Sequence, residues 1–309
     1  MKSATAFAPA SIGNLAVGFD VLGQAIAGPG DRCTATRSTR QGVTITAIQG
    51  LPCAVPIEAE KNTAGRAAQS LLESSGAGFG IELVLQKGIP LGSGMGGSAA
   101  SAVAGAVAVN ALLDSPLSVK DLLVHAMAGE ALAAGGVPHA DNIAPSLHGG
   151  LTLVQGHESP VVSSIPAPTG LLCVLVHPHL QVETSVARAL LSTSVPMDRV
   201  VEQLAALAGF ITGCFRDDPG LISSSLGDYI VEPQRAHMVP AFHAVQRGAL
   251  DSGALGCSLS GSGPSVFAWA RADDAERVAA AMQAAFAAAG VASDRWISAL
   301  DAPGARIES

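Results

Sequence analysis

A glycine-rich segment at residues 90–101 constrains the fold of this chain more than any other stretch. Four glycines fall within six residues, at positions 92, 94, 96 and 97. The alternating apolar residues of 81–86 predict a strand before it, and the small residues of 98–113 predict a helix after it. Glycine lets backbone N–H groups approach an anion, and a helix N-terminus adds unpaired N–H groups and a positive dipole end. The segment therefore indicates a phosphate-binding loop.

Two widespread phosphate-binding loops do not fit this segment. A Walker A loop is excluded, because Gly97 is followed by Ser98 and not by a lysine. Residues 92–97 match the dinucleotide pattern G-x-G-x-x-G, but that fingerprint needs a second strand ending in an acid, and a capped helix is expected from Ser118 instead. The structural alternative is a tight turn before a packing helix, which four clustered glycines disfavour.

The loop resembles that of the GHMP kinases, the superfamily of galactokinase, homoserine kinase, mevalonate kinase and phosphomevalonate kinase. Pro90 to Ala100 is similar to the family loop residue for residue. The resemblance implies an ATP site built from Pro90, Leu91, Gly92, Ser93, Gly94, Met95, Gly96, Gly97, Ser98, Ala99 and Ala100.

A second motif, Pro9 to Gly23, is similar to the opening motif of the homoserine kinases within this superfamily. Its glycines predict a loop, in which Asn14 and Asp20 stand among apolar residues. Loop capping is the ordinary explanation for such residues. The resemblance implies instead that both line an amino-acid site, and a substrate ammonium would give a buried aspartate the cation it needs.

Ser98 and Glu130 are candidates for a magnesium site. Glu130 lies among apolar and small residues on the helix expected from Ser118, where a solvent-facing side chain is the plain alternative. Mg²⁺ prefers hard oxygen ligands and usually takes one or two protein groups besides phosphates and water. In the family, the serine that opens the loop helix and a helix glutamate share this task, and these two residues match them.

The third motif, Pro138 to Gly150, resembles the His-x-Asp-Asn motif of the family. A similar aspartate is assigned as the catalytic base of mevalonate kinase, and Asp141 matches it. A mechanism without a base stays open, because a loose phosphoryl-transfer transition state makes little demand on the nucleophile's proton. Asn142 and His139 would then position the substrate. A buried turn network is the structural alternative for each of these residues.

The remaining candidates come from shorter matches to the homoserine kinases. Asn62 and Thr63 match residues near the adenine pocket, although capping of a helix explains them equally well. Lys87, just before the glycine loop, fits either a contact with ATP or a solvated strand end. The resemblance further implies substrate contacts for Thr184, for Arg188, for Arg235 in a Glu-Pro-x-Arg motif, and for Gly261. Gly261 belongs to a second glycine turn, Ser260–Pro264, which would meet a substrate carboxylate or the first glycine loop.

Composition excludes several classes of protein. The net charge of −8 and the absence of a basic run argue against nucleic acid as a partner. Five cysteines without a C-x-x-C pair indicate reduced thiols and a cytoplasmic location. The N-terminus lacks a signal-peptide pattern, and the apolar run at 98–113 is too short to cross a bilayer, so no membrane association is expected. His177 and His179 have no nearby carboxylate in the sequence, which favours a structural role over metal binding.

The motifs together predict an α+β chain with the two-domain GHMP kinase fold. The first domain, 1–160, would resemble the ribosomal S5 domain 2 fold and bind ATP, and the second, 161–309, would be ferredoxin-like. The expected reaction is the Mg²⁺-dependent transfer of phosphate from ATP to the hydroxyl of L-homoserine, with a homodimer left open. Another GHMP kinase, acting on mevalonate or a sugar, and a non-catalytic ligand sensor are the alternatives. Ile12-Gly13 and Gly97 depart from the commoner residues of the family motifs.

Overall fold

The structure, a computed structural model, describes residues 1–133, 139–156 and 159–308, so Pro138 of the third motif lies outside it. A seven-stranded sheet forms the first layer, with strand order β11-β1-β2-β4-β3 and with β5 and β6 attached through β2. Its strands are β1 (Ser3–Gly13), β2 (Leu22–Ser38), β3 (Val43–Gly50), β4 (Gly80–Lys87), β5 (Leu151–Gln155), β6 (Val161–Ile165) and β11 (Arg306–Glu308). All pairs are antiparallel except β3 with β4.

The first strand is longer than its sequence predicts. Residues 9–13 continue β1, and Ser11 to Gly13 pair with Ala25 to Gly23 after an irregularity at Pro9. The predicted loop at 9–23 is therefore wrong at both ends. Apolar Ile12 explains the difference, because extending the hairpin buries its side chain completely. The loop that remains, 14–21, carries Asn14 and Asp20 into the region between the two sheets.

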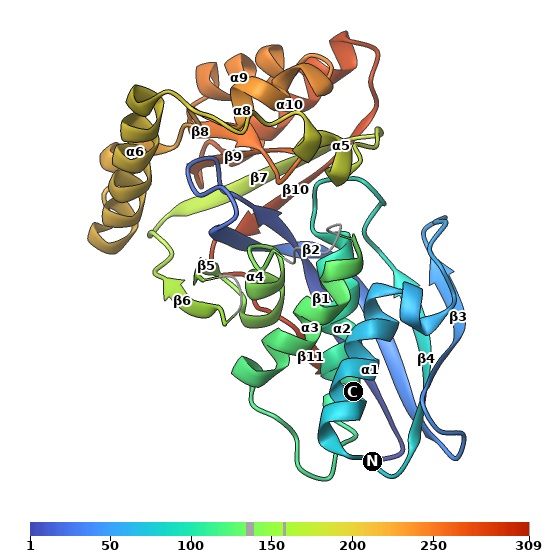
Figure 1. Cartoon of the computed structure of the whole chain (residues 1–309). Helices are drawn as coiled ribbons and strands as arrows, with labels where there is room; N and C mark the ends of the chain where they lie inside the picture. Colours follow the sequence, from blue (N-terminus) through green and yellow to red (C-terminus); the bar gives the residue numbers. More distant parts are fainter. Residues whose placement is uncertain (134–138, 157–158, 309) are drawn as a thin grey trace.

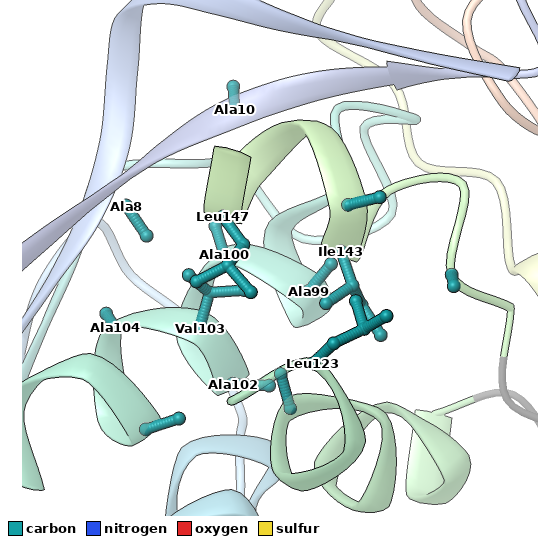
Figure 2. Packing of buried hydrophobic residues seen from close by; sticks show 14 of the residues in the cluster. Ala8, Ala10, Ala99, Ala100, Ala102, Val103, Ala104, Leu123, Ile143 and Leu147 are labelled. Atoms are coloured by element: carbon teal, nitrogen blue, oxygen red, sulfur yellow. The ribbon is translucent and has the colours of Figure 1, made fainter. Parts of the chain in front are cut away.

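Helices cover one face of the first sheet, as Figure 1 shows. They are the 3₁₀ helix η1 (Ala59–Lys61), α1 (Thr63–Ser75), α2 (Gly97–Asn110), α3 (Val119–Ala133) and α4 (Ile143–His148). Small residues let α2 lie close to its neighbours: Figure 2 shows Ala99, Ala100 and Val103 packed among β1, α3 and α4. A Cβ on Gly105 would lie 2.7 Å from a carbonyl oxygen of α1. Small residues on α2 therefore allow it to pack closely against α1.

A four-stranded antiparallel sheet forms the second layer, with order β10-β7-β9-β8. Its strands are β7 (Leu171–Pro178), β8 (Ala254–Leu259), β9 (Val266–Arg271) and β10 (Ser293–Ala299). The helices are α5 (Thr184–Ala189), α6 (Met197–Arg216), α7 (Pro219–Ser225), α8 (Glu232–Arg235), the 3₁₀ helix η2 (Ala236–Met238), α9 (Phe242–Asp251) and α10 (Ala275–Ala288). This β-α-β-β-α-β order is that of the predicted ferredoxin-like unit.

The two sheets share a buried contact. Phe210 of α6 and Trp269 of β9 pack with their ring centroids 5.1 Å apart, and the indole N–H of Trp269 donates to Gln24 Oε1 of β2 at 2.9 Å. The chain also returns to the first sheet at its end, because β11 pairs with β1. Division of the chain at residue 160 stays a prediction; β6 pairs with β5 just after that point.

No helix within the described residues combines the length and the apolar character needed to cross a membrane.

Candidate functional site

A cavity of about 480 Å³ lies between the two parts of the chain and receives residues from every motif. The sequence-predicted residues that line it are Asn14, Asp20, Pro90, Leu91, Gly92, Ser93, Gly94, Gly96, Gly97, Ser98, Glu130, His139, Asp141, Asn142, Thr184, Arg188, Arg235 and Gly261. A smaller cavity of about 240 Å³ contains Asn62 and Thr63 and shares Leu91 and Ser98 with the first. Met95, Ala99 and Ala100 are absent from both linings, because their side chains are packed in the core.

The glycine loop is held against the second glycine turn. Gly94 has φ +74°, and a Cβ there would lie 2.5 Å from the carbonyl oxygen of Ser260 and 2.6 Å from that of Gly263. Ser260 Oγ donates to the carbonyl of Gly94 at 2.6 Å, and the N–H of Ser265 donates to the carbonyl of Ser93 at 3.2 Å. The expectation that the second turn meets the first loop is confirmed, and Gly94 is required by this contact.

Ser98 and Glu130 come together at the start of α2. Ser98 Oγ donates to Glu130 Oε1 at 2.9 Å, whereas the buried Glu130 Oε2 has no hydrogen-bond partner within the described residues. The pKa of Glu130 is raised to about 8, chiefly by burial and also by the charge of Asp141, while the hydrogen bond from Ser98 and the charge of Lys87 limit the rise. A buried carboxylate oxygen without a partner, beside a hydroxyl, fits a hard cation that completes its coordination with phosphate and water.

Asp141 and Asn142 are neighbours in the lining of the main cavity. The pKa of Asp141 is raised to about 7, chiefly by burial and also by the charge of Asp20, while the charge of Arg188 limits the rise. Ser11 Oγ donates to Asn142 Oδ1 at 2.9 Å. A Cβ on Gly13 would lie 2.4 Å from Asp141 Oδ2, so the glycine that departs from the family motif leaves room for this carboxylate.

Opposite charges meet at the other end of the cavity. Arg188 Nη2 donates to Asp20 Oδ1 at 2.8 Å and to Oδ2 at 3.0 Å, and His139 Nδ1 lies 3.5 Å from Asp20 Oδ2. The ring of Phe19 lies 5.3 Å from the guanidinium of Arg188 and 5.4 Å from that of Arg235. Phe19 was not predicted as a site residue, since a lone aromatic in an apolar loop gives no signal.

Arg235 is buried, which excludes a surface salt bridge for this residue. Its Nε donates to the carbonyl of Ala187 at 3.1 Å. Burial and the neighbouring Arg188 lower its pKa, and Asp20 and Asp228 oppose them. A buried arginine beside another arginine is unfavourable unless an anion joins them, so this position favours an anionic ligand.

Asn14 lines the main cavity and also shapes the 14–21 loop. Its Nδ2 donates to the carbonyl of Gly261 at 3.1 Å, and its Oδ1 accepts from the N–H of Asp20 at 3.1 Å. Residues 14–16 and Asp20 all have positive φ, a backbone conformation that is unfavourable for residues with a side chain. Asn14 therefore places Asp20, and it ties the 14–21 loop to the second glycine turn.

Lys87 differs from both of its sequence interpretations. It is buried and forms an ion pair with Asp31, so it is not a solvated strand end, and its ammonium group is already surrounded by protein acceptors.

His177 lies buried beside Ser265 Oγ at 3.1 Å, and His179 pairs with Asp294 at 2.9 Å. No group of three or more potential metal-binding side chains occurs in the described part of the chain.

Comparison with known proteins identifies the family. The family described as GHMP kinases N terminal domain matches residues 62–150, and that described as GHMP kinases C terminal matches 201–288. A homoserine kinase of Xanthomonas campestris is 44% identical over 308 residues, which cover 99% of this chain and 94% of the relative. A homoserine kinase of Chlorobaculum tepidum is 42% identical and is covered to 99% by this chain. The crystal structure of homoserine kinase from Cytophaga hutchinsonii superposes with a TM-score of 0.96 at 43% identity, covering 100% of this chain and 98% of that one. The chain therefore belongs to the homoserine kinase family of the GHMP kinases.

Proposed function

We propose that this protein transfers the γ-phosphoryl group of ATP to the side-chain hydroxyl of L-homoserine, giving O-phospho-L-homoserine and ADP, as a step of threonine biosynthesis. The relatives that support this reading are named homoserine kinases. One observation carries it: a single cavity joins the glycine loop and the Ser98–Glu130 pair to a cluster of opposite charges at Asp20, Arg188 and Arg235.

ATP would lie with its phosphates against the glycine loop and the N-terminus of α2. The smaller cavity supports a place for the base, because Asn62 and Thr63 line it and Leu91 and Ser98 connect it to the main cavity. Asn62 also caps α1 by accepting from the N–H groups of Ala64 and Gly65. Asn62 would therefore shape this cavity through the helix, as well as line it.

Ser98 Oγ and Glu130 Oε2 are the protein oxygens that would hold Mg²⁺. When bound with ATP, this ion neutralises charge on the β- and γ-phosphates during transfer. The chain itself contributes a preformed hydrogen bond that orients Ser98, and a carboxylate whose second oxygen is left without a protein partner.

Homoserine carries one carboxylate and one ammonium, and the far end of the cavity offers partners for both. Arg188 and Arg235 would bind the carboxylate, because a guanidinium can donate two parallel hydrogen bonds to it. Asp20 would bind the ammonium, with His139 and Thr184 beside them in the lining. Mevalonate and galactose have no ammonium group, so neither would use this pairing of opposite charges.

The substrate hydroxyl would then lie toward Asp141 and Asn142, between the charged end and the glycine loop. A pKa of about 7 leaves a substantial fraction of Asp141 ionised at neutral pH, as required of a group that accepts the hydroxyl proton or a hydrogen bond from it. Asn142 is oriented by Ser11 and provides an amide next to this carboxyl.

An ADP-release assay tests the proposal directly. Homoserine, mevalonate, galactose and threonine are compared as phosphate acceptors at equal concentration with ATP and Mg²⁺. The proposal expects ADP release above the ATP-only background with homoserine, and it is contradicted if mevalonate or galactose is the better acceptor. Binding of ligands without any turnover would instead favour the ligand sensor. A homodimer and a cytoplasmic location stay predictions that belong to the same proposal.

A further inference from the structure

The ion pair between Lys87 and Asp31 has no part in the proposed reaction, although it lies beside the phosphate loop. Lys87 is the last residue of β4 and Asp31 belongs to β2, and their side chains are 3% and 2% exposed. Replacing a buried ion pair by apolar side chains is often neutral or stabilising. Stability alone therefore does not explain why the chain, which has only 17 lysines and arginines, places one of them in a buried ion pair.

Asp31 holds the chain where it enters the glycine loop. One carboxylate oxygen, Oδ1, accepts from the N–H of Gly88 at 2.9 Å and from that of Ile89 at 3.2 Å. These two residues directly precede Pro90, the first residue of the loop. The other oxygen, Oδ2, accepts from Lys87 and from Ser101 Oγ.

Lys87 and Ser101 hold the chain where it leaves the loop. Lys87 Nζ donates to the carbonyl of Gly97 at 3.2 Å and to Ser101 Oγ at 2.7 Å, both at the start of α2. With the bond to Asp31, all three N–H groups of the ammonium have protein acceptors. Lys87 and Ser101 contribute to the wall of the smaller cavity, but their polar atoms are bonded to each other and to Asp31.

We propose that Asp31, Lys87 and Ser101 form a clasp that joins the end of β4 to the start of α2 and so keeps the glycine loop in the shape that binds phosphate. They are positioning residues, and the inference rests on the proposed function only in taking the loop as the ATP site. The pair also has an electrostatic role, because an unpaired carboxylate behind the loop would repel phosphate. Without Lys87, Asp31 would still accept the hydrogen bonds from Gly88, Ile89 and Ser101.

Ser101→Ala tests the clasp without disturbing charge. Alanine suits a helix interior, so the variant should still fold, with a melting temperature lowered by the loss of the bonds to Lys87 and Asp31. We expect the Kd for MgATP, measured by calorimetry, to rise about tenfold, the size of one hydrogen bond to a charged group. Ser70→Ala is the matched control. Ser70 belongs to α1, where its Oγ lies 2.9 Å from His125 Nδ1 of α3, and loss of this contact should leave the Kd unchanged.

Variants that remove charge test the electrostatic part of the clasp. Lys87→Met should raise the Kd for MgATP more than the double variant Asp31→Asn/Lys87→Met, by about tenfold, because only the single variant leaves a bare carboxylate near the phosphates. Two results would show that the pair only supports the fold. One is an unchanged Kd for MgATP in Ser101→Ala. The other is an equal Kd in Lys87→Met and in the double variant, with the melting temperatures of both lowered. Since the readout is nucleotide binding, the clasp can stand even if the wild type fails to phosphorylate homoserine.

Discussion

Arg188 and Asp20 neutralise each other inside the candidate site, with Arg188 Nη2 at 2.8 and 3.0 Å from the two carboxylate oxygens. The two residues are also those expected to bind the opposite charges of the substrate. Homoserine can therefore exchange partners with the pair, its carboxylate taking the arginine and its ammonium taking the aspartate. A compound with only one of these charges would leave one member of the pair without a partner, which is unfavourable in a partly buried site.

Analogues with a single charge should be poor substrates. We expect 4-hydroxybutyrate, which lacks the ammonium, and 3-aminopropan-1-ol, which lacks the carboxylate, each to show kcat/KM at least about 100-fold below that of homoserine. Steady-state kinetics with the three compounds checks this. An analogue that is phosphorylated as efficiently as homoserine would mean that the ion pair between Arg188 and Asp20 stays intact during the reaction and does not exchange partners with the substrate.

Arg188→Leu and Arg235→Leu should each weaken transition-state binding by roughly 2–4 kcal/mol, about 30- to 1000-fold in kcat/KM for homoserine. The Kd for ATP should barely change, because neither residue lies in the glycine loop. Threonine carries the same two charges and should compete with homoserine in the wild type but not in these variants. Arg199→Leu, which removes an exposed ion pair with Glu202, serves as the control and should behave as wild type. Wild-type kinetics in both leucine variants would remove the arginines from the site.

Glu130→Gln keeps the shape of the side chain and removes the charge that would hold Mg²⁺. We expect kcat to fall about 100-fold or more, as when electrostatic stabilisation of a transition state is lost. Titration of Mg²⁺ at fixed ATP should show a higher requirement for the metal in the variant. If the variant turns over normally at ordinary Mg²⁺ concentrations, Glu130 is only a helix residue.

The pKa of about 8 at Glu130 makes metal binding release a proton. At pH 7 the group is mostly protonated, so binding of MgATP should release ~0.9 proton per site, and Glu130→Gln should abolish the release. Calorimetry in two buffers of different ionisation enthalpy measures it. The ligand-free folded protein retains a proton that the unfolded chain loses above about pH 4.5, so this group should lower the free energy of unfolding as pH rises toward 8.

Protonation of Asp141 should produce the acidic limb of the pH–rate profile, the region in which activity falls as pH is lowered. With MgATP saturating, Glu130 is already ionised, so kcat/KM for homoserine should fall as pH drops below about 7, where Asp141 becomes protonated. Asp141→Asn should lower the rate and remove this limb. A variant that is slow but keeps the wild-type pH profile would assign the limb to another group. Activity near that of the wild type would favour transfer without a base.

Gly94→Val should disturb the fold as well as ATP binding. The sequence suggests only that a side chain here would obstruct phosphate, but the missing Cβ of Gly94 faces two carbonyl oxygens of the second glycine turn. We expect a lower melting temperature together with weaker ATP binding. Gly92→Ala is the comparison, since its Cβ would meet a side-chain atom of Gln181 at 3.2 Å and no carbonyl oxygen closer than 3.3 Å. An unchanged melting temperature in Gly94→Val would show that the two turns can separate without loss.

Much of the fold could be predicted because local pattern and tertiary structure agree. The alternation at 81–86, the small residues after Gly97 and the cap at Asn62 each predict an element that the structure contains. The extension of β1 to Gly13 could not be predicted, because proline and glycine ordinarily end a strand, and only pairing with β2 stabilises them there.

The candidate site was harder to predict where a residue holds other parts of the site in place. Motifs identify Glu130 and Arg235, yet no pattern shows that Asn14 binds Gly261 across the two parts of the chain. Asp31 gives no signal either, because a single aspartate in a strand resembles a surface residue until its partners Lys87 and Ser101 are brought beside it. Such contacts join residues that are distant in sequence, and local spacing does not encode them.

The central claim is that the cavity phosphorylates the hydroxyl of homoserine, and ³¹P NMR of the reaction mixture tests it most directly. With homoserine, ATP and Mg²⁺, the account predicts a phosphomonoester signal split by two methylene protons, appearing in step with ADP and strongly reduced in Glu130→Gln. Inorganic phosphate as the only new signal besides that of ADP, or a phosphomonoester formed from mevalonate or galactose but not from homoserine, would contradict it.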